Sequence, residues 1–164
     1  MKLDAIPSEK IPLNTRSLWK KKHAFGEIEK IAFTSEAGHD IPAYVCIPSK
    51  ASPPYKFFIC LQGHSTGMHN SIAVEFGDED KAKLIEGDRD FGIECMKRRI
   101  AAVCIEQRAF GECEDSRKHD NNFPRCHNPA MMAIMNGRTL LGERIFDVNR
   151  TIDYIMSRGD ADKE

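Results

Sequence analysis

The chain has 164 residues, a formal net charge of −1 and a hydrophobic content of 41%. This length and composition suffice for one globular domain with a buried core, and they exclude an intrinsically disordered chain. The balanced charge gives no indication of nucleic acid, an anionic membrane or an acidic molecule as a partner.

The first half of the chain predicts an irregular segment followed by a β-hairpin. Residues 1–26 are polar and contain Pro7 and Pro12, so we expect no regular structure there. From residue 27, apolar residues alternate with polar or smaller ones over 27–35 and again over 41–47. Turn-forming residues lie between these two runs, and the pattern therefore predicts a hairpin that ends at Pro48.

Two continuous apolar runs, residues 57–61 and 100–105, predict strands that are buried on both faces, as in a parallel sheet. A short helix is expected over residues 91–96, just before the second run. Strand, helix and strand in this order are typical of a βαβ unit. The two runs would therefore lie in one sheet.

A long amphipathic helix is predicted near the end of the chain. Apolar residues recur there at steps of three and four: Leu141, Ile145, Val148, Ile152 and Ile155. We expect this stripe to be the face that packs on the sheet. Asn136 and Gly137 are expected to separate this helix from a shorter apolar run over residues 130–135.

One short motif follows the first buried strand: residues 63–67 match the pattern G-x-S-x-G, which can place a nucleophilic serine, here Ser65, on a tight turn from strand to helix. The sequence after Gly67 does not predict the helix that such a turn requires. The loop also comes early in the chain, after a hairpin and one strand. We therefore favour a role as an oxyanion-hole loop, which donates a backbone N–H to developing negative charge. A plain structural turn stays open for either interpretation.

Five segments occur in an informative order and spacing: residues 41–44, 61–69, 87–91, 106–112 and 137–140. Together they resemble the acetyl xylan esterase-like and dienelactone hydrolase-like esterases of the α/β-hydrolase superfamily. The resemblance covers residues 27–164 and implies an α/β fold, namely a partial α/β-hydrolase fold with an N-terminal β-hairpin followed by parallel strands with flanking helices. It implies a single domain that is truncated before the nucleophile strand, preceded by the irregular segment 1–26.

The resemblance also implies roles for individual residues. The backbone N–H of His64, next to Gly63, would be the oxyanion donor, and Gln62, Gln107 and Arg108 would line the pocket loops. Arg108 either binds a carboxylate or holds its loop. Ala109 and Phe110 depart from the glycine-rich family sequence at this point. The nucleophile, acid and base of the family are expected after residue 164, so none is assigned here.

Three hypotheses for the function follow. The first is the N-terminal half of a serine carboxylic-ester hydrolase, acetyl esterase-like, which supplies the oxyanion loop but not the triad. The second is a complete small serine hydrolase that uses Ser65 with Asp115 and either His119 or His127. The third is a non-catalytic half-domain that pairs with itself or with another chain. We expect a small ester as the substrate of the full-length enzyme, and no nucleic-acid or membrane partner.

Neither a metal nor a cofactor is expected, because the cysteine and histidine spacings match no common zinc pattern. Residues 1–10 lack the apolar stretch of a signal peptide and no run reaches the length of a membrane span, which predicts a cytoplasmic protein. Without the nucleophile strand, we expect the strand over residues 100–105 to become an exposed edge. The chain would then pair with a second copy or with a complementary C-terminal chain.

Overall fold

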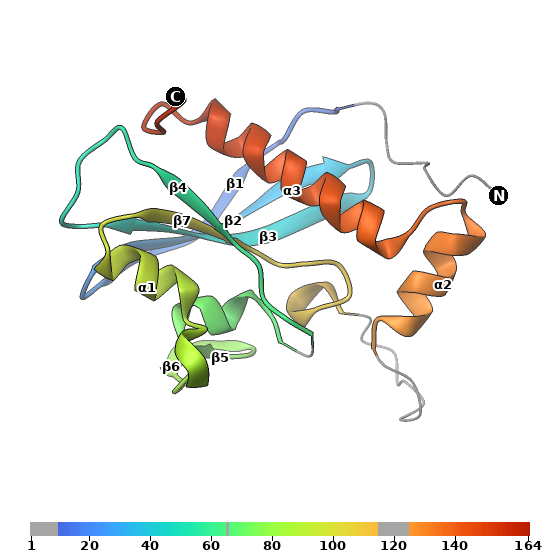
Figure 1. The fold of residues 1–164 in the computed structure, drawn as a ribbon, viewed down its shortest axis with the longest axis horizontal. Helices are drawn as coiled ribbons and strands as arrows, with labels where there is room; N and C mark the ends of the chain where they lie inside the picture. The colour runs from blue at the N-terminus through green and yellow to red at the C-terminus, as the bar shows by residue number, and fades with distance from the viewer. Residues whose placement is uncertain (1–9, 65, 115–124) are drawn as a thin grey trace.

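The computed structural model describes residues 10–64, 66–114 and 125–164. Its centre is a five-stranded sheet in the order β1-β2-β3-β7-β4, with helices on both faces (Figure 1). The strands of this sheet are β1 (Arg16–His23), β2 (Gly26–Glu36), β3 (His39–Pro48), β4 (Phe57–Cys60) and β7 (Ala101–Ile105). The described residues contain no helix that is long and apolar enough to cross a membrane.

The first three strands form an antiparallel meander. The β2–β3 hairpin confirms the predicted one, with Glu36 facing His39 across the turn. The expectation of an irregular segment over residues 1–26 is wrong for β1, which pairs with β2 from Arg16 to His23 with one irregularity between Ser17 and Trp19. Most of β1 is exposed and polar, so it lacks the apolar alternation that reveals a half-buried strand. The strand conformation of β1 therefore depends on its hydrogen bonds to β2 and cannot be recognised from its own residues.

The two predicted strands are β4 and β7, and they pair in parallel as expected. Burial on both faces is confirmed for β7 but is wrong for β4, where Phe58 is 59% exposed. The expectation that residues 100–105 form an exposed edge is wrong, because β7 lies between β3 and β4 and all five of its residues are buried. The outer strand is β4 instead. Both runs are continuously apolar, and such a pattern cannot distinguish an inner strand from an outer one.

The polar stretch between β4 and α1 (Phe91–Lys97) contains the 3-10 helices η1 (Met68–Ile72) and η2 (Glu86–Asp88) and a small hairpin, β5 (Val74–Glu75) and β6 (Asp78–Ala82). Glu79 fastens this hairpin to the sheet. Its carboxylate accepts hydrogen bonds from the Trp19 indole at 3.1 Å and the Tyr44 hydroxyl at 2.9 Å, and it forms an ion pair with Lys30.

The predicted C-terminal helices are α2 (His127–Met135) and α3 (Leu140–Ser157), and they separate at Asn136 and Gly137 as expected. Thr139 caps α3, accepting the Gly142 N–H at 2.9 Å. Helices α1 and α3 lie on opposite faces of the sheet (Figure 1).

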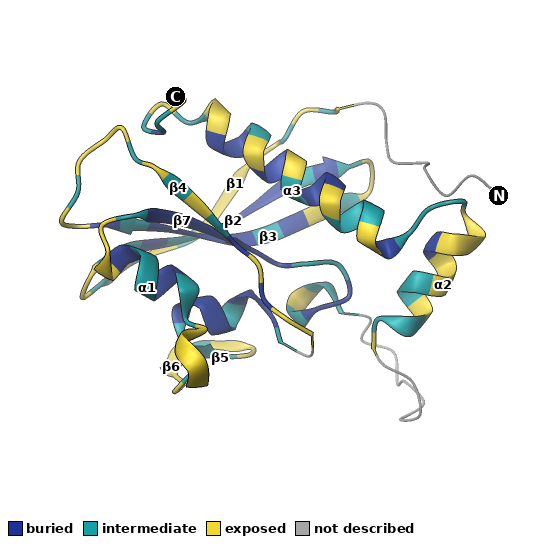
Figure 2. Cartoon of the chain, in the orientation of Figure 1, coloured by how far each residue is buried: buried dark blue, intermediate teal, exposed yellow. Residues whose placement is uncertain are grey.

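The predicted packing face of α3 is wrong in part. Of the apolar stripe, Ile155 is buried, whereas Leu141 is 68% and Ile145 is 50% exposed. Exposed and buried residues alternate along the helix in Figure 2. The face that packs combines aromatic and polar side chains instead: Phe146, Asp147, Arg150, Thr151 and Tyr154. These polar groups have hydrogen-bond partners on the sheet or along the helix, which allows them to be buried.

Candidate oxyanion loop

The candidate site lies where β4 and β7 end. Because the two strands are parallel neighbours, with Cys60 level with Cys104, the loops that follow them emerge at the same edge of the sheet. The loops are joined directly, since the Gln107 side-chain amide donates to the Gln62 backbone carbonyl. The Gln62 side chain is buried and donates to the Ser71 hydroxyl at 2.7 Å and the Arg89 carbonyl at 2.8 Å. Gln62 and Gln107, both predicted for the pocket loops, therefore meet here.

Glu106 is a functional candidate that the sequence analysis misses. It follows β7, is 1% exposed, and accepts backbone hydrogen bonds from Met68 at 3.1 Å and Glu112 at 3.0 Å. Burial raises the pKa of this carboxyl to about 7, more than its backbone donors lower it. The available signal was an acidic residue directly after a fully apolar strand. The carboxyl group links the loop before η1 to the loop after β7.

Two glycines make room for this carboxylate. A Cβ on Gly111 would lie 2.0 Å from Glu106 Oε2, and the φ of Gly111 is +44°, a conformation that side chains disfavour. A Cβ on Gly67 would meet the same oxygen at 2.9 Å. The second glycine of the G-x-S-x-G match therefore has a steric role toward Glu106.

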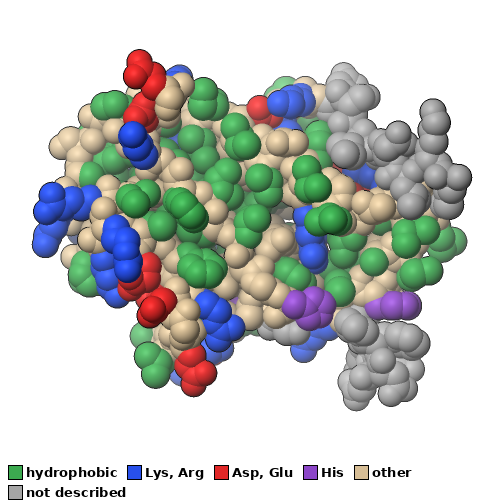
Figure 3. Space-filling model, in the orientation of Figure 1, with side chains coloured by type: hydrophobic (Ala, Val, Ile, Leu, Met, Phe, Trp, Pro, Cys, Tyr) green, Lys and Arg blue, Asp and Glu red, His purple; other side chains and the backbone are tan. Residues whose placement is uncertain are grey.

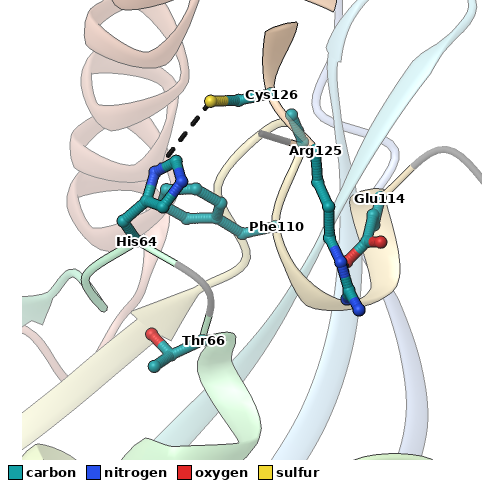
Figure 4. Close-up of a pocket in the computed structure, with 7 residues that line it drawn as sticks. His64, Thr66, Phe110, Glu114, Arg125 and Cys126 are labelled. Carbon is teal, nitrogen blue, oxygen red and sulfur yellow. Dashed lines mark hydrogen bonds and ion pairs between the residues drawn. The ribbon is translucent and has the colours of Figure 1, made fainter. Parts of the chain in front are cut away.

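His64 is one of the residues that line a small pocket (Figure 4). Its ring meets the Phe110 ring edge-on at 5.5 Å between centroids, and its Nδ1 is 3.9 Å from Cys126 Sγ. Nearby, the Thr66 hydroxyl donates to the Gly63 carbonyl at 2.6 Å. Among the described residues, the His64 backbone N–H has no hydrogen-bond partner. The full lining of the pocket is His64, Thr66, Ala109, Phe110, Glu114, Arg125 and Cys126.

Most residues of the Ser65 hypothesis lie outside the part of the chain that the structure describes. Ser65, Asp115 and His119 lie outside the described residues, and His127 is the first residue of α2. After Gly67 the chain forms the five-residue 3-10 helix η1, although we expected no helix there, and η1 ends at Ala73 in a left-handed conformation. A nucleophile elbow leads into a helix of the α/β-hydrolase core, and η1 is followed instead by the β5–β6 hairpin.

Arg108 points away from this pocket and into an ionic cluster with α3. Its guanidinium pairs with Asp147 at 2.7 Å and Glu36 at 2.5 Å. Burial alone would lower the pKa of Arg108, but these two carboxylates outweigh it and raise the pKa. Its backbone carbonyl accepts from Arg144, whose guanidinium stacks 4.1 Å from the Phe110 ring centroid. The Arg108 guanidinium therefore binds carboxylates of this chain itself, and these contacts join its loop to β2 and α3.

Within the described ranges, no group of three or more His, Cys, Asp or Glu side chains could hold a metal ion. All six cysteines are free thiols, and Cys46, Cys60 and Cys104 are buried in the core. Burial in apolar surroundings is ordinary for reduced cysteine.

Solved structures share this fold at low sequence identity. A proposed acetyl xylan esterase from Bacteroides fragilis matches 98% of this chain with a TM-score of 0.81 and 13% identity, and the match covers 41% of that protein. Acetyl xylan esterase 1 from Thermoanaerobacterium sp. matches 93% with a TM-score of 0.58 and 14% identity, over 43% of its length. A glucuronoyl esterase from Solibacter usitatus matches 95% with a TM-score of 0.55 and 11% identity, over 45% of its length.

No family model matches the sequence, and no curated protein does. The likeness is therefore one of fold, and the chain spans less than half the length of the three structural neighbours described. The chain has a partial α/β-hydrolase fold of the kind found in acetyl xylan and glucuronoyl esterases.

Proposed function

We propose that this chain is the N-terminal half of an acetyl esterase-like carboxylic-ester hydrolase and supplies its oxyanion loop. The observation that carries the proposal is the position of Gly63 and His64 just after β4, at the edge where β4 and β7 end, with a His64 backbone N–H that has no hydrogen-bond partner among the described residues. Ligands of α/β sheets bind at this edge. The nucleophile, acid and base belong to the remaining part of the domain.

In this role, the His64 N–H donates a hydrogen bond to the ester carbonyl oxygen as negative charge develops on it. A donor fixed in advance stabilises the tetrahedral intermediate more than the substrate, which lowers the barrier. Gln62, Gln107 and Glu106 hold the two loops together, so the donor does not have to be reoriented during the reaction. The substrate class is a small carboxylic ester.

The alternative is a complete hydrolase that uses Ser65. The β5–β6 hairpin after η1 disfavours it, because the nucleophile would lack the helix that normally follows an elbow. Labelling of the 164-residue protein with a fluorophosphonate probe distinguishes the two proposals. We expect no labelling that depends on Ser65, and stoichiometric labelling lost in Ser65→Ala would favour the alternative.

The main proposal is tested by two substitutions at the same position, in this chain combined with the C-terminal part of the domain that the proposal requires. His64→Pro removes the backbone N–H, whereas His64→Ala keeps it. We expect His64→Pro to lower kcat for p-nitrophenyl acetate by about 100- to 1,000-fold, the usual cost of losing one oxyanion donor. His64→Ala should retain most of the activity. Equal losses in both variants, with both proteins folded, would contradict the role of the N–H.

A further inference from the structure

The loop after β7 contains an alanine in a backbone conformation that favours glycine. Ala109 has a φ of +65°, which lies in the left-handed region. It is the third residue of a turn that the Phe110 N–H closes by donating to the Gln107 carbonyl at 2.9 Å. Turns with a positive φ at the third residue usually carry glycine there. The methyl group of Ala109 is therefore kept at a conformational cost.

Contacts on both sides hold this turn in place. Arg144 donates to the Arg108 carbonyl at 2.6 Å, and its guanidinium lies 4.1 Å from the centroid of the Phe110 ring. The Ala109 N–H donates to the Cys113 carbonyl at 3.1 Å. These contacts fix the left-handed conformation although residue 109 has a side chain.

The left-handed conformation gains meaning from where Ala109 lies. It is 4% exposed and is one of the residues that line the pocket beside His64. Other described residues also combine a side chain with a positive φ, but none of them lines this pocket: Asn14, Ala73, Asp88 and Arg99. The conformation alone therefore does not mark a site, whereas its combination with the pocket suggests a use for the methyl group.

The pocket is small, and its walls differ in polarity. Its volume is about 10 Å³, roughly the space that one water-sized group requires. Ala109 and Phe110 are buried and supply apolar surface, whereas His64 and Thr66 supply polar groups (Figure 4). The hydrophobic side chains over α3 and β4, by contrast, form an open surface that sets no limit on size (Figure 3). The pocket thus matches a methyl-sized group attached to a hydrogen-bond acceptor.

We propose that Ala109 is the residue that limits the acyl group of the substrate to acetyl. This inference rests on the proposed function, in which the His64 N–H binds the ester carbonyl oxygen. The acyl group is joined to the same carbonyl carbon, so it lies beside this N–H and enters the pocket against the Ala109 methyl. A butyryl chain, with two further methylene groups, overlaps with that methyl, whereas glycine at position 109 leaves space for it.

Small carboxylates test the size limit in the 164-residue protein without any chemical step. Their carboxylate oxygen takes the place of the ester carbonyl oxygen, and their alkyl group takes the place of the acyl chain. Sodium acetate and sodium butyrate are titrated at constant ionic strength while NMR follows the backbone amides of His64 and Phe110. We expect saturable shifts of both amides, with butyrate binding about tenfold more weakly than acetate.

Three variants connect this preference to the methyl group. Ala109→Gly should reduce the preference for acetate to about threefold or less, and Ala109→Ser, which adds one atom, should weaken the binding of acetate. The matched control Ala73→Gly makes the same change at another left-handed alanine, which ends η1 outside the pocket, and should keep the wild-type preference. Neither glycine variant should lower the urea midpoint, because glycine adopts this conformation readily. The midpoint also verifies that each variant is folded.

Equal binding of the two carboxylates by the wild-type protein would overturn the proposal. An unchanged preference in Ala109→Gly, or the lack of a saturable response to acetate, would overturn it as well. These results are independent of the His64→Pro experiment, which measures a rate. A tenfold preference combined with equal losses in His64→Pro and His64→Ala would contradict only the proposed role of the N–H.

Discussion

At the scale of single residues, Glu106 explains most about the candidate site. Its carboxyl group accepts N–H groups from both sides of the site, at Met68 and Glu112, and the glycines at 67 and 111 leave space for it. Four other titratable groups interact with it or lie close by: Tyr44, His69, Glu112 and Cys113. The apolar strand before it was predictable, but one of its partners, Met68, lies 38 positions earlier, and no local pattern indicates this contact.

Glu106 predicts a pH dependence of stability. Its pKa is about 7 in the folded protein against an ordinary value of 4.5, so the folded state binds a proton that the unfolded state releases. The free energy of unfolding should therefore fall as pH rises from 4.5 to 7, by about 3 kcal/mol for this group. The free energy of unfolding, measured by urea denaturation at several pH values, should fall less steeply with pH in Glu106→Gln than in wild type. The control Glu86→Gln changes an exposed residue and should leave this pH dependence as in wild type. Identical slopes in wild type and Glu106→Gln would contradict the assignment.

At the scale of elements, α3 shows how far periodicity can be used. The spacing of its apolar residues predicted a helix over 141–156, and the helix spans Leu140–Ser157. The same spacing failed to predict the packed face, because Asp147 and Arg150 are buried and polar. Their partners, Ser35 and Arg108 for Asp147 and the Thr34 carbonyl for Arg150, are distant in sequence. A pattern that counts only apolar residues cannot detect such polar contacts.

Two isoleucines on α3 test which face packs. Ile155 is 8% exposed and Ile152 is 45% exposed. We expect Ile155→Ala to lower the free energy of unfolding by about 2–5 kcal/mol, the usual cost of truncating a buried aliphatic side chain. Ile152→Ala makes the same chemical change on the exposed side and should cost clearly less. Urea denaturation of both variants provides the measurement. Equal losses in the free energy of unfolding would support the packing face that the apolar stripe predicted.

At the scale of the whole molecule, the kinds of element were predictable, but the order of the strands in the sheet was only partly so. The hairpin, the βαβ unit and the two C-terminal helices follow from local patterns. The position of β7 between β3 and β4 does not follow from local patterns, because both β7 and β4 are apolar and only their neighbours in three dimensions differ. The polar strand β1 also lacked a local signal, since its order depends on pairing with β2.

The exposed stripe on α3 predicts self-association of the isolated chain at micromolar concentration. Leu141, Ile145 and Ile152 are uncovered, and apolar surface of this kind favours contact between molecules. Sedimentation velocity should show larger species in wild type and fewer in the double variant Ile145→Lys/Ile152→Lys. Because both positions are exposed, the double variant should remain folded, which circular dichroism can verify. A well-dispersed wild-type monomer would count against this prediction.

The position of β7 between β3 and β4 also bears on the order in which a growing chain can fold. The strands β1, β2 and β3 pair with one another, so this meander can form once residue 48 has left the ribosome, although the second edge of β3 later pairs with β7. Strand β4 follows at residue 57, but its only strand partner in the described chain begins at residue 101. During synthesis, β4 must therefore wait unpaired for more than 40 residues, with its apolar side chains available to chaperones or to other chains.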